Sequence, residues 1–226
     1  MTSKSSAKKI IRKADPENIE IRFSHILKIL IDWINTTILV VIAGRGMAKS
    51  TLIQAQRSAD CVRDMPGAPL AFVANTYSNL KDNIMPAVKK GWEMQGLIEG
   101  VHYVYCKRPP GSWRRKCVDI VDEFKNTIFF WNGSVIYLGS LDNPSLLAGK
   151  SVVHIFYDEA KYAQDKKVNR AMPILRGDAI KFGYSIYFLG LTITTDMPDI
   201  NEGEYDWFFR YAKQMKPERI EKIVQA

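Results

Sequence analysis

The sequence has few of the features that mark secreted, membrane-spanning or metal-cluster proteins. It contains only three cysteines, Cys61, Cys106 and Cys117, an odd number without the spacing of a metal site or of a disulfide framework. No apolar run is long enough to cross a bilayer. The lysine-bearing segment 1–15 has neither the apolar core nor the small-residue cleavage site of a secretory signal. We therefore expect a protein of a reducing, cytosolic compartment.

The composition is that of one sizeable globular domain, with 46% hydrophobic and 25% charged residues in 226. The net charge is +8, from 32 lysines and arginines against 24 acids. Cations gather in an acid-free stretch over residues 1–14 and again over residues 107–116. Such clusters suit a polyanion such as nucleic acid, but they also serve as a solubilising tail and a solvated loop, and charge alone does not decide.

Apolar periodicity and turn residues divide the chain into alternating helices and strands. We expect a basic, flexible tail over residues 1–17, an α/β domain over 18–215 and the start of a linker, cut before a further domain, over 216–226. The alternation predicts a largely parallel sheet with helices on both faces. The predicted helices are 18–34, 49–62, 76–95 and a stretch near 165–175; the predicted strands are 37–42, 70–74, 152–157 and 185–191, with a hairpin over 128–138 whose Asn132-Gly133 pair is typical of a type I′ turn.

Residues 43–51, Ala-Gly-Arg-Gly-Met-Ala-Lys-Ser-Thr, follow the apolar run 38–42 and predict a phosphate-binding loop. Backbone N–H groups of such a loop and of the helix after it face the anion. In this pattern Lys49 reaches the β- and γ-phosphates, and the Ser50 hydroxyl helps to hold Mg²⁺. The alternative is an ordinary strand-to-helix turn that carries a lysine.

Two alanines depart from the usual pattern G-x-x-x-x-G-K-[ST]. Glycine ordinarily stands one and six residues before the lysine, where this chain has Ala48 and Ala43. Alanine resists a positive φ and crowds a phosphate that passes close to the backbone. The strength of nucleotide binding and the rate of turnover therefore stay open, with Ala48 as the reason.

Two adjacent carboxylates, Asp158 and Glu159, end the apolar strand that begins at residue 152. In P-loop ATPases such a pair divides the work: Asp158 would orient Mg²⁺ through its water shell, and Glu159 would activate the attacking water. Adjacent acids at the end of a buried strand are costly to desolvate, which favours a functional role for them over an ordinary structural one. The alternative is a helix N-cap. We interpret His154, inside the strand, as a packed core histidine rather than a ligand.

Residues 188–196 end in two hydroxyls and an acid, Thr194, Thr195 and Asp196. A polar group on the strand beside a phosphate loop can contact the γ-phosphate or the attacking water and transmit the outcome of hydrolysis. Threonine is also common in ordinary strands. This third motif therefore gains its weight from its order after the other two.

The motifs in this order resemble the N-terminal ATPase domain of a tailed-bacteriophage large terminase, the motor that packages DNA into a capsid. Gly44–Ser50 is similar to the arginine-bearing Walker A loop of that family, and Tyr157–Ala160 to its Walker B motif. Residues 132–149 resemble the stretch that leads into Walker B, and residues 192–196 resemble the coupling motif. The resemblance spans roughly residues 38–199.

The resemblance implies an α/β P-loop NTPase of the ASCE type, with a central, mostly parallel sheet flanked by helices and an added hairpin. It implies ATP and Mg²⁺ as cofactors, and hydrolysis that drives double-stranded DNA into a procapsid. The implied partners are a portal protein, a small terminase subunit and further copies in a homo-oligomeric ring, usually a pentamer, in the cytoplasm of an infected bacterium and without a membrane. The family's nuclease domain would lie beyond Ala226, so no nuclease activity is expected from this segment.

The resemblance also assigns roles to residues of this chain. The nucleotide loop comprises Gly44, Arg45, Gly46, Met47, Ala48, Lys49, Ser50 and Thr51. The catalytic residues are Glu159, Arg45 and Lys49; the metal ligands are Ser50 and Asp158; the coupling residues are Thr194, Thr195 and Asp196. The family often has an arginine before the position of Gly149, proposed as a trans-acting finger; this chain has Ala148 there, and Lys150, Arg114 or Arg115 could take that role.

Two other functions stay open at this point. A helicase-like, DNA-dependent ATPase that acts on single strands would place aromatic platforms in its channel, and Trp113 and Trp131 are the candidates. A non-hydrolysing structural or DNA-docking module would tolerate a degenerate phosphate loop, although it would have no need of a buried acid pair at 158–159.

Overall fold

A computed structural model describes residues 26–113 and 115–225, and the predicted tail over 1–17 lies outside them. The strands of this part of the chain are β1 (Ile38–Ile42), β2 (Pro69–Ala74), β3 (Tyr103–Tyr105), β4 (Thr127–Phe130), β5 (Val135–Ser140), β6 (His154–Asp158) and β7 (Gly190–Thr195). The α-helices are α2 (Ile26–Ile34), α3 (Ala55–Asp64), α4 (Tyr77–Asn79), α5 (Met85–Met94), α6 (Asp165–Ala171), α7 (Ala179–Phe182) and α8 (Pro217–Gln225). None of the described helices is both long enough and apolar enough to cross a membrane.

Two π-helical and five 3-10 segments complete the described elements. The π-helical segments are η1 (Lys49–Gln54) and η2 (Leu80–Ile84); the 3-10 segments are η3 (Pro144–Leu146), η4 (Ala160–Tyr162), η5 (Met172–Ile174), η6 (Ile200–Glu202) and η7 (Trp207–Gln214). The segments α4, η2 and α5 follow one another without a break, so the helix predicted over 76–95 is present. The Thr76 hydroxyl caps its N-terminus by accepting a hydrogen bond from the Asn79 N–H.

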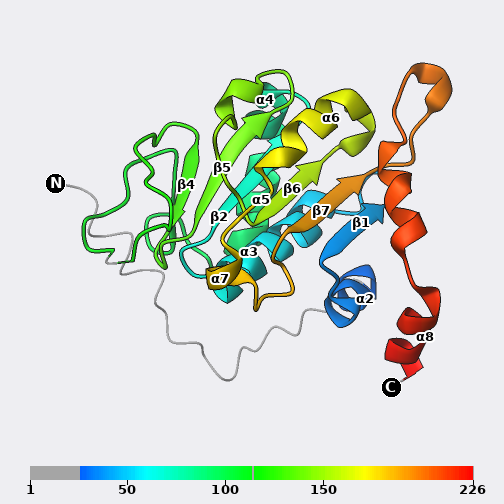
Figure 1. Cartoon of the computed structure of the whole chain (residues 1–226), viewed down its shortest axis with the longest axis horizontal. Helices are drawn as coiled ribbons and strands as arrows, with labels where there is room; N and C mark the ends of the chain where they lie inside the picture. Colours follow the sequence, from blue (N-terminus) through cyan, green and yellow to red (C-terminus); the bar gives the residue numbers. More distant parts are fainter. Residues whose placement is uncertain (1–25, 114, 226) are drawn as a thin grey trace.

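The strands form one mixed sheet in the order β1-β7-β6-β2-β5-β4-β3. The first five of these pair in parallel, and β4 and β3 are added antiparallel, which confirms the mostly parallel sheet with a hairpin. The strand that comes last in the chain, β7, lies between β1 and β6. The carboxyl ends of these three strands, which carry the three sequence motifs, therefore meet at one edge (Figure 1).

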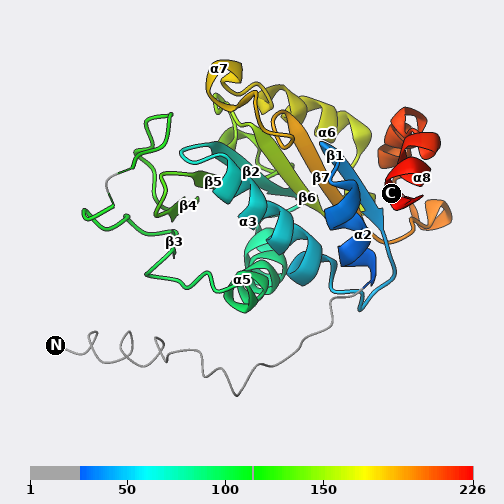
Figure 2. The ribbon, with the colours of Figure 1, turned by 90° about the horizontal axis from the view of Figure 1, so that it is seen from below.

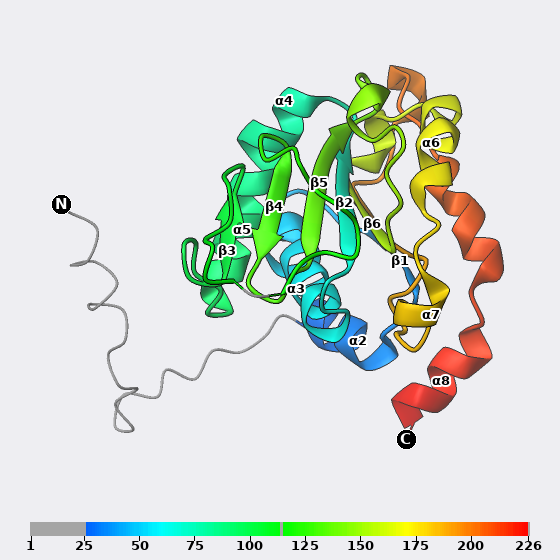
Figure 3. The same ribbon diagram turned by 60° about the vertical axis from the view of Figure 1, so that its left-hand side comes forward.

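Helices cover both faces of the sheet because its central strands bury alternate side chains on opposite sides. In β2, Leu70 and Phe72 belong to the buried cluster that contains Trp92 of α5, whereas Val73 belongs to the one that contains Val168 of α6. Figure 2 shows α2, α3 and α5 below the sheet and α6 above it. In Figure 3, β3 forms one side of the molecule, and η7 and α8 run along the opposite side. Helix α8 occupies most of the segment 216–226, whose role as a linker stays a prediction.

The helix that was expected over 49–62 begins instead as the π-helix η1 and becomes α-helical only at Ala55. The Ala55 N–H donates to Ser50 O, five residues back. The backbone of α5 at Gly91 lies directly against the backbone of this segment, since a Cβ on Gly91 would lie 2.0 Å from Thr51 O. π-Helical turns are rare and concentrate at functional sites.

The β4–β5 hairpin forms where it was predicted, but its turn is not type I′. The Phe130 N–H donates to Ser134 O (2.9 Å) and the Gly133 N–H to Phe130 O (3.0 Å), which encloses a three-residue loop. Among the loop residues only Gly133 has a positive φ, of 88°, whereas a type I′ turn needs it at both central residues. The buried Asn132 side chain explains the difference, because it donates to Val62 O and accepts from the Ser134 N–H.

The strand predicted over 185–191 is also displaced. It begins only at Gly190 and runs to Thr195, and residues 185–189 form turns. A side chain at Gly190 would collide with its neighbour on β6, since a Cβ would lie 2.5 Å from His154 Nδ1. The later start places Thr194 inside the sheet, opposite Asp158.

The contact between α5 and η1 can be tested by substitution. Gly91→Ala is expected to lower the free energy of unfolding by about 1–3 kcal/mol or more, because the colliding Thr51 oxygen belongs to the backbone. Chemical denaturation measures this. Gly111→Ala, where a Cβ meets nothing within 4 Å, is the control, and equal stability of the two variants would contradict the packing described.

Candidate nucleotide site

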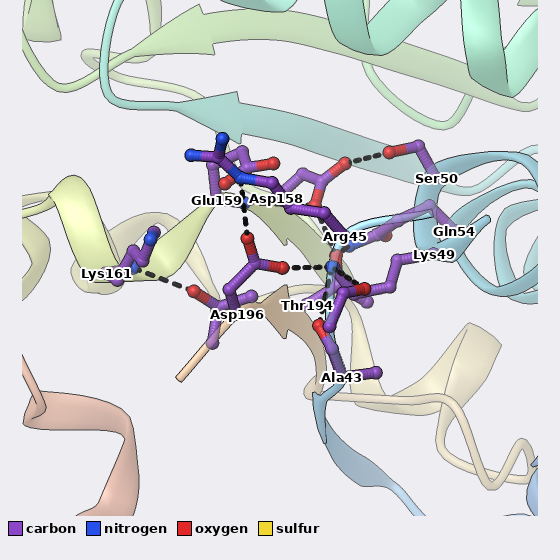
Figure 4. Close-up of polar contacts among 12 residues, drawn as sticks. Ala43, Arg45, Lys49, Ser50, Gln54, Asp158, Glu159, Lys161, Thr194 and Asp196 are labelled. Atoms are coloured by element: carbon purple, nitrogen blue, oxygen red, sulfur yellow. Dashed lines mark hydrogen bonds and ion pairs between the residues drawn. The ribbon is translucent and has the colours of Figure 1, made fainter. Parts of the chain in front are cut away.

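The loop after β1, the two acids at the end of β6 and the residues at the end of β7 lie together at the carboxyl edge of the sheet (Figure 4). Open α/β sheets bind ligands at this edge. Residues 44–48 of the loop are exposed, whereas Lys49 is buried at its base. The three sequence motifs therefore form one cluster, open on the side of the loop.

The Lys49 ammonium group lies inside the loop and uses all three of its donors there. Nζ donates to Ala43 O (2.7 Å), to Gly44 O (3.1 Å) and to Asp196 Oδ1. The loop backbone thus wraps around the lysine, and the carboxylate from β7 closes the third side. The carboxylate neutralises the ammonium charge, which would otherwise be expensive to bury.

Asp196 holds both cations of the loop. Besides Lys49 it faces Arg45, whose Nε lies 3.5 Å from Oδ2. Burial by itself would raise the pKa of Asp196, but the hydrogen bond and charge of Lys49 outweigh it, so the pKa lies below its ordinary value. The Arg45 side chain is 83% exposed, so solvent screens most of its contribution.

The buried Asp158 carboxylate accepts hydrogen bonds from all three motifs. Ser50 Oγ donates to Oδ2, Thr194 Oγ1 donates to Oδ1 (2.6 Å), and the Glu159 N–H donates to the same Oδ1 (3.0 Å). Neither acid caps a helix through its side chain, since Glu159 precedes η4 without a capping hydrogen bond. The N-cap alternative is therefore excluded for this pair.

Glu159 leaves β6 in a strained conformation. Its φ is 58°, in the left-handed region that side chains other than glycine rarely adopt. Burial raises the pKa of its carboxyl, and the negative charges of Asp158 and Asp196 raise it further, against the cations of Lys49 and Lys161. Strained residues with perturbed carboxyls are typical of active sites.

Ala48 takes the conformation that its sequence position requires. Its φ of 52° and ψ of 34° are left-handed, like the positive φ of 82° at Gly46. The loop thus has the backbone path of a glycine-bearing loop, although one of its glycines is replaced. The left-handed conformation costs alanine about 1–2 kcal/mol relative to an ordinary one.

The donor set beside the loop fits a magnesium ion carried by a nucleotide. Mg²⁺ in such sites takes one or two protein oxygens and completes its octahedral shell with phosphate and water. Ser50 Oγ and the Asp158 carboxylate supply oxygens of this kind. Among the described residues no three His, Cys, Asp or Glu side chains converge, so a metal cage built by protein alone is absent there.

No protein-family model matches the chain, and no curated protein matches its sequence. Its fold does match solved structures. The ATPase domain of the large terminase from Thermus phage P74-26 is 16% identical, with a TM-score of 0.53, over 84% of this chain and 69% of that one. An arginine-to-alanine mutant of the same domain is 17% identical over the same shares, with a TM-score of 0.51. The large terminase of a thermophilic bacteriophage is 14% identical, with a TM-score of 0.50, over 75% of this chain and 37% of that one.

The chain has the fold of a large-terminase ATPase domain. It spans 37% of the length of the thermophilic-phage terminase, so it corresponds to one part of that longer protein. At these identities the likeness concerns the fold, and the roles of individual residues rest on the geometry of the site.

The terminase-like fold brings together most of the residues that the sequence singled out. The cluster contains Arg45, Lys49 and Ser50, the acids 158–159 and the coupling residues 194–196, where Thr195 Oγ1 accepts from the Lys161 N–H (3.1 Å). Thr51 points its carbonyl at Gly91 instead. The exposed residues 44, 46 and 47 form the outer arc of the loop.

Two of the residues considered for a trans-acting role, Lys150 and Arg115, have contacts or positions outside this cluster. Lys150 Nζ lies over the ring of Tyr137, 4.7 Å from its centre, and Arg115 is exposed on the long loop 106–126. Arg114 lies outside the described residues. Trp131 is half-buried and edge-on to His102 at 5.6 Å.

His154 is a core residue, as interpreted from the sequence. Its ring is fully buried between Tyr187 O (2.8 Å from Nδ1) and the Thr192 hydroxyl (2.9 Å from Nε2). Burial lowers its pKa to about 3, so it is neutral at physiological pH.

Sequence reasoning missed two groups that complete the site. Gln54, four residues after Ser50, donates a hydrogen bond to Thr194. Lys161, two residues after Glu159, forms an ion pair with Glu204 (2.9 Å). The helical spacing of Gln54 from Ser50 was the signal available for the first; nothing in the sequence linked Lys161 to Glu204.

The strain at Ala48 predicts a stabilising substitution. Ala48→Gly should raise the free energy of unfolding by about 1 kcal/mol, because glycine adopts the left-handed conformation freely. Thermal or urea unfolding measures the change. Ala148→Gly, at a position without positive φ, should give no gain, and a gain of equal size there would refute the explanation.

The Lys49–Asp196 pair predicts a pH-dependent stability. Asp196→Asn should lower the free energy of unfolding by about 2–3 kcal/mol at pH 7, since the buried ammonium loses its counter-charge. Because the folded pKa of Asp196 is depressed, its contribution is complete above about pH 4, the ordinary carboxyl pKa, and fades as the pH falls further.

Urea unfolding of both proteins at pH 7 and at pH 3.5 checks the Asp196 prediction. The difference between wild type and variant should shrink at the lower pH. Asp122→Asn, an exposed acid on the 106–126 loop, is the matched control. A difference of constant size at both pH values would show that the ion pair is not its source.

Proposed function

We propose that this domain hydrolyses ATP with Mg²⁺ and uses the energy to move double-stranded DNA into a viral procapsid. The observation that supports this most is the convergence on Asp158. One carboxylate joins the phosphate-type loop, the acid pair and the coupling residues through direct hydrogen bonds. The large-terminase ATPase fold supports the assignment to a packaging motor.

In the proposed binding step the loop takes up the triphosphate. Residues 44–48 are exposed and directly precede η1, and the N–H groups at the start of a helix favour anions. The γ-phosphate competes with Asp196 for Lys49 and for the exposed Arg45, because both cations contact that carboxylate. Ser50 and, through water, Asp158 would hold Mg²⁺, which would supply positive charge to the phosphate oxygens.

In the proposed chemical step Glu159 is the general base. A carboxylate oxygen of Glu159 takes a proton from the water that attacks the γ-phosphorus, while the bond to the ADP oxygen breaks. A pKa raised by burial and by the neighbouring acids makes this carboxylate a stronger base than an exposed glutamate. Asp158 stays a hydrogen-bond acceptor and ligand, because its oxygens are already held by three donors.

The proposed coupling runs through Asp196 and the segment after it. A phosphate that draws Lys49 and Arg45 away releases the Asp196 carboxylate. The chain from residue 197 to residue 206 is tied back to the acid motif by the Lys161–Glu204 ion pair and by the Tyr205 N–H on Lys161 O (2.8 Å). A shift at Asp196 would therefore be transmitted to η7 and α8.

The wider assembly belongs to the same proposal. The exposed cations Lys107, Arg108, Arg115 and Lys116 lie on the loop 106–126 and offer a surface for DNA phosphates. We propose a ring of copies, a pentamer on the capsid, that contacts a portal protein and a small terminase subunit in the bacterial cytoplasm. Residues 18–215 would be the motor domain, 1–17 a basic tail and 216–226 a link toward a nuclease domain.

Glu159 and Lys49 give the decisive variants. Glu159→Gln should abolish phosphate release and keep ATP binding, since it removes the base but no phosphate contact. Lys49→Ala should weaken both. Because the folded pKa of Glu159 is raised, the acid limb of the wild-type rate profile should lie above the ordinary glutamate value of about 4.3.

Phosphate release with duplex DNA, with single-stranded DNA and without DNA measures these effects. Glu93→Gln, an exposed glutamate on α5, is the control. Wild-type turnover in Glu159→Gln would remove Glu159 from the base role. Stronger stimulation by single strands would favour the helicase-like alternative, and ATP binding without any release would favour the non-hydrolysing module.

A further inference from the structure

Gln54 lies at the centre of the site, although neither the motifs nor the proposed chemistry assign it a role. It ends the π-helix η1 and is completely buried. Its side chain points from η1 toward the ends of β6 and β7 (Figure 4). The inference drawn from it rests on the proposed function, because it concerns the Asp158 carboxylate that would hold Mg²⁺.

The hydrogen-bond partners of Gln54 fix the orientation of its amide. Nε2 lies 3.0 Å from Tyr157 O and 3.4 Å from Thr192 O. A backbone carbonyl can only accept a hydrogen bond, so the nitrogen and not the oxygen of the amide must face these two groups. The same nitrogen lies 2.7 Å from Thr194 Oγ1.

This orientation also fixes the direction of the Thr194 hydroxyl. Since the amide nitrogen can only donate, Thr194 Oγ1 must accept from it. The proton of the hydroxyl is then free for its other neighbour, Asp158 Oδ1, at 2.6 Å. A one-way relay results, in which Gln54 donates to Thr194 and Thr194 donates to Asp158.

We propose that Gln54 is the positioning residue that presents the Asp158 carboxylate to the Mg²⁺ of the nucleotide. With Oδ1 held by Thr194 and by the Glu159 N–H, Oδ2 is the oxygen left facing Ser50, the other predicted metal ligand. Without the Gln54 donor, the Thr194 hydroxyl would lose the contact that directs its proton toward Asp158, and Asp158 would lose a fixed orientation.

The carbonyl side of the same amide supports a specific role. Gln54 Oε1 is buried and has no hydrogen-bond partner among the described residues. A buried acceptor without a partner costs stability. An apolar residue of the same size would avoid that cost, so the residue is better explained by what its nitrogen does than by packing.

The test measures how Mg²⁺ changes nucleotide affinity in Gln54→Met and in Thr194→Val. The first keeps the size of the side chain and removes its donors; the second keeps the shape of threonine and removes the relay hydroxyl. Mg²⁺ is titrated against a fluorescent ATP analogue, and the affinity is also measured in EDTA. Both variants should need about 10–100-fold more Mg²⁺ than the wild type, the usual effect of removing the hydrogen-bond partner of a metal ligand. Affinity in EDTA should stay at the wild-type value.

Two further proteins sharpen the result. Gln56→Met carries the same substitution two residues further on, in α3, where the amide bonds to Asp60 and to no other described side chain, and should need wild-type Mg²⁺. The double variant of Gln54→Met with Thr194→Val should lose no more than the worse single variant, because the two residues act in series. Melting curves establish that each variant is folded.

The outcomes separate this inference from the proposed function. A wild type whose ATP affinity is the same with and without Mg²⁺ overturns the proposed function and the inference with it. If the wild type needs Mg²⁺ and either Gln54→Met or Thr194→Val needs no more Mg²⁺ than the wild type, the inference alone is overturned. Additive losses in the double variant would also overturn it, because they would mean that the two side chains act separately.

Discussion

A single carboxylate at the end of β6 has to be shared by three segments that are far apart in the sequence. Asp158 accepts from Ser50 after β1, from Thr194 on β7 and from the backbone of Glu159. This sharing is possible only because β7 lies between β1 and β6, in register with both. The order of the strands therefore determines the geometry of the site, and the helices on both faces serve to hold that order.

The charges of the site are balanced within the protein. Lys49 is surrounded by two loop carbonyls and Asp196, and Asp196 in turn faces Arg45. A buried ion pair of this kind contributes little net stability, but breaking it without replacement is costly. An incoming phosphate can supply that replacement, which makes the pair suited to sensing whether a phosphate is bound. The proposed coupling rests on this exchange of one anion for another.

Two strained residues lie at the same edge of the sheet. Ala48 and Glu159 both have left-handed backbone conformations that alanine and glutamate rarely adopt, and the helix after the loop begins with π-helical hydrogen bonding. Each of these features costs free energy locally and is held in place by the packing around it, such as the backbone contact between Gly91 and η1. The described apolar residues of the sheet lie in two large buried clusters and a small third one around Val41.

Local pattern along the chain was enough to predict the class of fold and most residues at the site. Apolar runs that end in Lys49-Ser50, in Asp158-Glu159 and in Thr194-Thr195-Asp196 are readable from neighbouring positions alone. The type I′ turn was wrong because Asn132 forms tertiary hydrogen bonds to Val62 and Ser134 that local propensity does not contain. The start of β7 was wrong because the residues before it are held in turns: Ser185 donates its hydroxyl to Asp64, the Phe188 N–H donates to Ser185 O, and Leu189 has a left-handed φ of 52°.

Which of these groups meet depends on the packing of the folded chain. The contacts of Lys49 with Asp196 and of Gln54 with Thr194 each join residues more than a hundred positions apart. Such contacts follow from the strand order and from the rotation of the π-helix, and neither leaves a periodic signal in the sequence. Composition and spacing can name a lysine and an acid; the direction in which a buried amide donates is set by the carbonyls that surround it.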